Sequence, residues 1–160
     1  MAYINSEGKV GLYDHKNRLI IPFEYDMIYD SYYGQKGKDR YIVQKEGKVG
    51  TVDSDNEVVI PILYDGLSGW VEYGPKGHFV KKDGKYGLIS PEGKTIVPIE
   101  YDYVGLPVKG VIVVRKAGKY GAISWNNRVI LPCIYDKLID DISFWSFDFG
   151  EKHEDKLVAL

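Results

Sequence analysis

Apolar and polar positions follow one pattern that recurs four times along the chain. Each copy has an apolar run, a Gly-Lys pair, a second apolar run, a polar turn, and a third run rich in β-branched residues that precedes a Pro. The third runs are Leu19-Ile20-Ile21, Val58-Val59-Ile60, Thr95-Ile96-Val97 and Val129-Ile130-Leu131. Short runs of this kind between turn formers predict strands, and no stretch of ten residues has helical periodicity. The pattern predicts an all-β fold.

The copies share one motif: Gly-Lys-x-Gly, ten residues, Pro, two residues and Tyr-Asp. The first Gly precedes the Pro by fourteen residues in every copy. The motifs begin at Gly8, Gly47, Gly84 and Gly118 and end at Tyr25-Asp26, Tyr64-Asp65, Tyr101-Asp102 and Tyr135-Asp136. Such constancy indicates a repeat protein.

The motif residues predict local geometry. The first Gly follows one other turn residue between two apolar runs, which predicts a two-residue hairpin that needs positive φ. The second Gly predicts a close packing contact or a bulge. The Pro is expected to end the third strand or to bend it at a sheet edge, because it lacks the N–H that a central ladder requires.

Apolar residues at adjacent strand positions predict that both faces of each sheet are covered, as in stacked sheets. The predicted core contains the residue before each Pro and the residue between the two motif Gly residues: Ile21, Ile60, Val97, Leu131, Val10, Val49, Tyr86 and Tyr120.

We interpret residues 1–160 as one repeat domain, with repeats at about 3–40, 41–78, 79–111 and 112–140. Each repeat is expected to hold three or four short antiparallel strands. A C-terminal strand over 156–160 is expected to pair near Tyr3 and Ile4 and close a propeller-like ring. An open β-solenoid, or a fragment of a longer array, is the alternative.

The motif resembles the bacterial WG repeat, also called the KWG repeat, over all four copies. The Trp that gives the family its name is absent, because Val10, Val49, Tyr86 and Tyr120 occupy its place. The resemblance implies a propeller-like β fold and a binding scaffold with no known catalytic residue. Many members of the family occur near bacterial toxin systems or serve as surface or interaction modules.

Composition narrows the functional classes. The 160 residues are 44% apolar and 28% charged with a net charge of −2, which is typical of a globular protein. A nucleic-acid module would have a basic face, and no apolar segment is long enough to span a membrane. The N-terminus has no signal-peptide pattern. A single cysteine fits a reducing compartment, so we expect a cytoplasmic protein.

Candidates for chemistry are few, and we expect no enzyme, no metal and no cofactor. Cys133 aligns with Phe23, Ile62 and Ile99, which favours a buried small hydrophobe over a nucleophile. The histidines, at 15, 78 and 153, occupy non-equivalent positions and are expected on the surface. The acidic stretch from Asp53 to Glu57 lacks the Gly and the final Glu of a calcium loop and is interpreted as a polar turn.

The spacers that follow each Tyr-Asp differ in length, and those after the first, second and fourth copies are rich in aromatic residues, whereas the third has none beyond Tyr103. Insertions in repeat proteins tend to map to one face, which is often the binding face. Tyr and Trp anchor many interfaces, so the predicted binding residues are Tyr32, Tyr33, Trp70, Tyr73, Phe144, Trp145 and Phe147. Packing of these rings under their own loops is the alternative.

Three functions remain open. The first is a non-enzymatic protein-binding module, such as an immunity or inhibitor protein for a bacterial toxin. Its partner is expected to be basic, because the last spacer combines aromatic residues with Asp140, Asp141, Asp148, Glu151, Glu154 and Asp155. The second is a carbohydrate-binding domain, and the third is a structural segment of a longer array.

Overall fold

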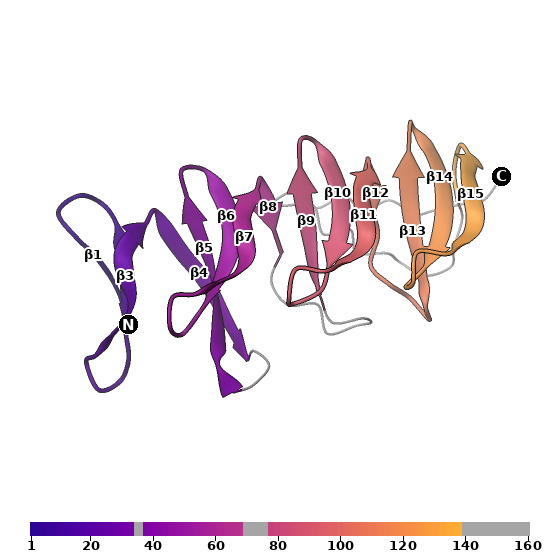
Figure 1. Ribbon diagram of the computed structural model, residues 1–160. Coiled ribbons are helices and arrows are strands. Elements are labelled where there is room, and N and C mark those ends of the chain that lie inside the picture. The colour runs from indigo at the N-terminus through magenta and orange to yellow at the C-terminus, as the bar shows by residue number, and fades with distance from the viewer. Residues whose placement is uncertain (34–36, 69–76, 139–160) are drawn as a thin grey trace.

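Four antiparallel sheets make up the described part of the chain, which comprises residues 1–33, 37–68 and 77–138 of the computed structural model (Figure 1). The first sheet contains β1 (Ala2–Ile4), β2 (Val10–Tyr13) and β3 (Leu19–Tyr25). The second contains β4 (Met27–Tyr33), β5 (Asp39–Lys45), β6 (Lys48–Asp53) and β7 (Val58–Tyr64). The third contains β8 (Gly66–Leu67), β9 (His78–Lys82), β10 (Lys85–Ile89) and β11 (Thr95–Tyr101). The fourth contains β12 (Tyr103–Val104), β13 (Val111–Lys116), β14 (Lys119–Ser124) and β15 (Val129–Tyr135). The all-β prediction is confirmed.

The sheets stand one behind another in an open row, with β1 and β15 at opposite ends (Figure 1). The closed ring favoured from the sequence is therefore not confirmed. The expected strand over 156–160, on which closure depended, lies outside the described residues.

Each space between neighbouring sheets holds an apolar cluster, as predicted from the adjacent apolar positions. Val43 on β5 belongs to the cluster shared with the first sheet, whereas Ile42 beside it belongs to the cluster shared with the third sheet. A third cluster joins the third and fourth sheets. Successive strand residues point to opposite faces, so the inner sheets are covered on both sides.

Sequence repeat and sheet are out of phase. The short strand after each Tyr-Asp, which is β4, β8 or β12, pairs with the strand that precedes the next Gly-Lys motif. A four-stranded sheet therefore takes its first strand from one copy and its other three from the next. The first sheet has three strands, and β1 is one of its edges.

Three of the four Gly-Lys turns are two-residue hairpins, as predicted. Glu46, Asp83 and Ala117 have φ of 52°, 51° and 50°, and the Gly that follows each also has positive φ. Positive φ at both positions defines the type I′ turn, whose twist suits a hairpin.

The first turn differs from the other three. Ile4 pairs with Val10 and Tyr3 with Gly11, whereas in the second copy Val43 pairs with Gly50. β1 is thus shifted by one residue, and a shift of one residue exchanges the two faces of a strand. Ile4 is 72% exposed, whereas Val43, at the same distance before the motif Gly, is buried against the first sheet.

The third strands do not end at their Pro but bend at a bulge on the sheet edge, which is the second of the two predicted outcomes. β3 runs through Pro22 to Tyr25, and its register moves from Leu12–Ile21 to Val10–Tyr25, so β3 carries extra residues at a bulge. The same irregularity occurs in the other three sheets. Pro is tolerated there because the strand is an edge strand and the bulge requires no N–H from it.

The second Gly of the motif lies opposite this bulge, in agreement with its prediction. A Cβ on Gly50 would lie 2.5 Å from the Ile60 carbonyl oxygen, and one on Gly87 would lie 2.7 Å from that of Val97. No side chain fits at this distance. The bulge brings the edge strand so close that only Gly is accommodated.

Most of the predicted core is confirmed. Ile21, Ile60 and Val97 are fully buried, Val10 and Val49 are buried, and Tyr86 and Tyr120 are half-buried. Leu131 is the exception, because 38% of it is exposed. Among the described residues no sheet follows β15, so nothing covers Leu131 as the next sheet covers its three counterparts.

We expect Gly50→Ala to lower the free energy of unfolding by about 1–3 kcal/mol, the usual cost of forcing extra atoms into a packed site. Gly105→Ala is the control, since its Cβ would have its nearest neighbours at 3.3 Å. Urea unfolding measures both variants. An effect of Gly50→Ala no larger than that of the control would contradict the close approach at the bulge.

Candidate interaction surface

One edge of the row carries a repeated ion pair between the motif Lys and the motif Asp of the same copy. The pairs are Lys9–Asp26, Lys48–Asp65, Lys85–Asp102 and Lys119–Asp136. The Lys follows the hairpin turn and the Asp follows the third strand, so each pair joins the two ends of one copy of the motif.

The second oxygen of this carboxylate reaches the next sheet. Asp26 Oδ2 accepts the N–H of Glu46 at 2.6 Å, and Asp65 Oδ2 accepts the N–H of Asp83 at 2.7 Å. Asp102 Oδ2 accepts the N–H of Gly118 at 3.4 Å. Each donor belongs to the Gly-Lys turn of the following sheet, so the motif Asp is a link between sheets as well as an ion-pair partner.

These contacts lower the pKa of the motif Asp residues. The hydrogen bond from Lys48 is the main reason that the pKa of Asp65 lies below its ordinary value, and the N–H of Asp83 acts in the same direction. The pKa values of Asp26 and Asp102 are also lowered, mainly by the hydrogen bonds from Lys9 and Lys85. Hydrogen bonds and nearby positive charge favour the ionised carboxylate.

The opposite edge carries the polar turns between the second and third strands of each motif. Asp14, Asp53, Ser90 and Ser124 occupy the same place in the four copies, and the side-chain oxygen of each accepts backbone N–H groups two or four residues ahead. The third turn residue has positive φ, with Asn17, Asn56, Gly93 and Asn127 in this role. These are the turn formers that the sequence indicated.

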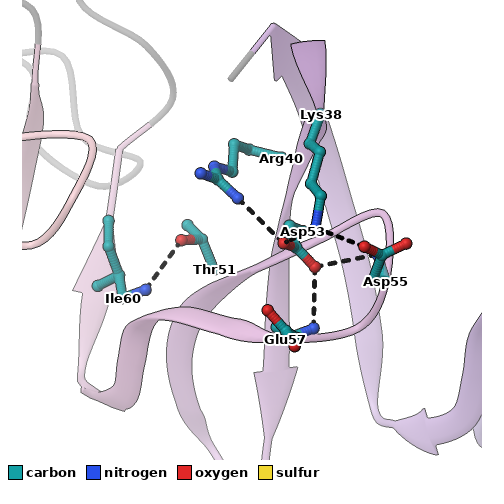
Figure 2. Close-up of polar contacts among 7 residues, drawn as sticks. All are labelled: Lys38, Arg40, Thr51, Asp53, Asp55, Glu57 and Ile60. Atoms are coloured by element: carbon teal, nitrogen blue, oxygen red, sulfur yellow. Dashed lines mark hydrogen bonds and ion pairs between the residues drawn. The ribbon is translucent and has the colours of Figure 1, made fainter. Parts of the chain in front are cut away.

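The second turn has an additional charge cluster (Figure 2). Asp53 Oδ1 accepts the N–H groups of Asp55 and Glu57 at 2.9 Å, while Oδ2 lies 3.4 Å from Lys38 Nζ and 3.5 Å from Arg40 Nη1. Lys38 also pairs with Asp55. Both oxygens of Asp53 are therefore occupied by donors of the chain.

The interpretation of this stretch as a polar turn agrees with that geometry. Over residues 1–33, 37–68 and 77–138, no group of three or more His, Cys, Asp or Glu residues is arranged to hold a metal ion. Within the described part of the chain, no helix is long and apolar enough to cross a membrane.

The prediction that the histidines lie on the surface is wrong for His78. It is fully buried, its Nδ1 lies 2.9 Å from the Ser68 carbonyl oxygen, and burial lowers its pKa. Tyr41 and Ile112 occupy the same position in the second and fourth copies and are also buried. Alignment of the copies was the signal that could have placed His78 in the interior.

Cys133 is half-buried and packs against the cluster between the third and fourth sheets. Burial raises the pKa of its thiol. A thiol with a raised pKa holds less of the nucleophilic thiolate at neutral pH, which agrees with the interpretation of Cys133 as a small hydrophobe.

The spacers between successive copies leave the row at equivalent points, although the third has no aromatic residue beyond Tyr103. The first spacer connects β4 to β5, the second β8 to β9 and the third β12 to β13, and in each pair the two strands are antiparallel neighbours. Because the sheets repeat one another, these connections depart from the same edge of the row, the edge that carries the polar turns (Figure 1).

The structure describes only part of the predicted binding set. Tyr32 and Tyr33 lie on β4, where their backbones pair with Arg40 and Asp39. Trp70, Tyr73, Phe144, Trp145 and Phe147 lie outside the described residues. Tyr29, in the same spacer as Tyr32, is exposed and its hydroxyl donates to Gln44 Oε1 at 2.8 Å.

A second exposed apolar area was missed at the sequence level. Val129, Ile130, Leu131 and Ile134 on β15 are all exposed. They belong to the fourth copy of the motif, and among the described residues no sheet follows β15 to cover them.

The repeated motif matches a known protein family. Residues 11–48, 50–86 and 86–120 match the family described as WG containing repeat, and together they cover more than half of the chain. The chain belongs to the WG repeat family. Each matched segment of the WG protein crosses from one sheet to the next. No curated protein and no solved structure matches the chain.

We expect Asp65→Asn to lower the urea midpoint of the WG protein, because it removes the charge that holds Lys48 and weakens the acceptor for the N–H of Asp83. Asp136→Asn is the matched control: it breaks the same type of ion pair, but Asp136 is 84% exposed and contacts no turn of a further described sheet. Equal loss in both variants would show that the ion pair alone matters.

We also expect stability to fall as the pH drops below about 4. The pKa of Asp14 is lowered to about 2, mainly by the N–H of Arg18, and the pKa of Asp26, Asp65 and Asp102 is lowered as well. Groups with a depressed native pKa stabilise the fold above their unfolded pKa of about 3.9, and this contribution disappears as the pH approaches the native value.

Urea titrations between neutral pH and pH 2 measure this loss. Asp65→Asn should show a shallower decline than the parent chain, since one of the responsible carboxylates is gone. A midpoint that stays constant over this range would contradict the assignment.

Proposed function

We propose that this WG repeat protein is a non-enzymatic protein-binding module. The observation that carries the proposal is the division of the row into a constant part and a variable part. The ion pairs, bulges and apolar clusters repeat from sheet to sheet, whereas the connections that depart from the polar-turn edge differ in length and sequence. Repeat proteins commonly bind partners through such variable segments.

The chemistry of the spacers supports a protein partner with basic character. They contain Trp70, Tyr73 and Trp145, and aromatic side chains of this kind supply much of the binding energy at interfaces. The last spacer adds acidic residues, which favour a positively charged partner through complementary potentials. An immunity or inhibitor protein for a bacterial toxin, acting in the cytoplasm, is the form of this function that we propose.

Affinity capture from the native host tests the proposal. The 160-residue chain is immobilised and bound proteins are identified by mass spectrometry. Recovery of one basic protein that binds the purified chain with a defined stoichiometry supports the proposal. Recovery of a glycan-bearing fraction that is released by free sugar, or of no partner other than the chain itself, contradicts it.

We expect Trp145→Ala to weaken binding of the captured protein at least tenfold with a nearly unchanged melting temperature, because an anchor ring at an interface does not stabilise the fold. Trp125→Ala is the matched control. Trp125 packs against the cluster between the third and fourth sheets, so its loss should lower the melting temperature. Calorimetric titration and thermal unfolding measure the two effects, and a large drop in melting temperature for Trp145→Ala would assign that ring to the core.

A further inference from the structure

The three junctions between neighbouring sheets are built alike, and each has two halves. On the preceding sheet, the third strand offers an apolar face, the motif Asp offers an acceptor, and the residues after Asp form an added strand. On the following sheet, the strand before the Gly-Lys turn accepts that added strand. Its bulged edge strand packs inward, as Ile62 and Ile99 do against the clusters of the first and second junctions.

The last sheet has the first half of a junction with no second half among the described residues. We call this half the tail face; it comprises Ile130, Leu131, Ile134, Tyr135 and Asp136. Tyr135 is half-buried where Tyr25, Tyr64 and Tyr101 are buried. Ile134 is 62% exposed, although its counterparts Glu24 and Glu100 pair with Lys45 and Lys116 of the following sheet.

The added strand is also unused at this end. Lys137 and Leu138 occupy the positions of Met27-Ile28, Gly66-Leu67 and Tyr103-Val104, which pair with β5, β9 and β13. Within residues 77–138, Lys137 and Leu138 belong to no strand. The tail face thus presents apolar area, a carboxylate and a strand segment, the three parts that every internal junction takes from its preceding sheet.

The first sheet has the second half of a junction. We call it the head face; it comprises β1 and the rings of Tyr3, Tyr13 and Phe23. The Tyr3 and Tyr13 rings meet edge to face with centroids 5.5 Å apart, and Phe23 lies next to Tyr13 at 6.1 Å. Phe23 stands where Ile62 and Ile99 stand, so these rings lie on the face that an inner sheet turns toward its predecessor.

β1 also has free backbone groups. Across the ladder, the backbone of Met1 hydrogen-bonds to Tyr13 and that of Asn5 hydrogen-bonds to Lys9. Hydrogen-bonded and non-hydrogen-bonded pairs alternate along antiparallel strands, so the N–H and C=O of Ala2 and Ile4 point away from β2. An edge of this kind is a template for another strand. In the first two internal junctions, the motif Asp accepts the N–H of the residue before the turn Gly. In the first turn this residue is Glu7, and its N–H already donates to Asn5 Oδ1. Docking here therefore relies on strand pairing and apolar burial.

We propose that a second copy of this chain docks its head face on the tail face, so that chains join head to tail in the manner of the internal junctions. The occupant follows from continuity: the same chain contains three such junctions and both halves of a fourth. The contact is heterologous, because two different surfaces meet, and such contacts extend into linear oligomers unless the rotation closes a ring.

Sedimentation velocity of the 160-residue chain over a range of concentrations tests the association. The weight-average mass is expected to rise with concentration through dimer to longer species. The combined tail variant Leu131→Lys/Ile134→Lys places charge on the tail face, and the head variant Ile4→Pro removes an outward N–H from β1. Each variant alone is expected to be monomeric.

Val58→Lys is the matched control. It places the same charge on an exposed apolar side chain of the second sheet, away from both ends of the row, and is expected to associate like the parent chain. Equal urea midpoints of the control and the two variants establish that all are folded.

A mixture of the two variants decides the geometry. One intact tail face remains in the head variant and one intact head face in the tail variant, so the mixture is expected to form one-to-one dimers and nothing longer. A parent chain that stays monomeric at every concentration overturns the proposal. Association that survives in the head variant also overturns it, because it would show two tail faces pairing with each other.

Discussion

The arrangement of the sheets depends on the motif Asp, whose two oxygens serve two different parts of the chain. One oxygen accepts from the Lys of its own copy, and the other accepts a backbone N–H from the turn of the next sheet. A single carboxylate can do both only where the end of one third strand lies beside the following hairpin turn. The fixed spacing between Gly-Lys and Tyr-Asp keeps the two groups in reach, which is a physical reason for the constancy of the motif.

The bulge opposite the second Gly has a related role. It brings the Pro-containing strand close to the neighbouring strand at a position where only Gly fits. No hydrogen bond at the bulge requires an N–H from the Pro. In the second sheet the Thr51 hydroxyl accepts the N–H of Ile60 at this irregular place, so no buried donor is lost there (Figure 2). Gly and Pro therefore act together. Gly leaves room for the close approach of the edge strand, and Pro can occupy that strand because the bulge requires no N–H from it.

Local chemistry explains what could be predicted from the sequence. The two-residue hairpins, the polar turns, the close approach at the second Gly and the apolar columns depend on residues near one another in the chain, and these predictions were confirmed, apart from the first hairpin and Leu131. The shift of β1, the exposure of Leu131 and the burial of His78 depend on what lies across the sheet or on the next sheet, and the residues alone did not reveal them. The predicted site was reached only in part, because five of its seven aromatic residues lie outside the described residues, in spacers whose length and sequence differ from copy to copy.

The offset between sequence repeat and sheet has a consequence for any array of this type. Because each copy supplies the first strand of the following sheet, one sheet of an array needs this strand, and one strand segment needs a sheet, from somewhere other than the neighbouring copy. A closed ring would satisfy both within the chain, and an open row leaves them at opposite ends. Full burial of one aliphatic side chain contributes about 1.5–3 kcal/mol, and the tail face exposes several, so covering it stabilises the row by an amount comparable to a substantial part of a domain's net stability. The geometry of the ends therefore follows from the same motif that builds the interior.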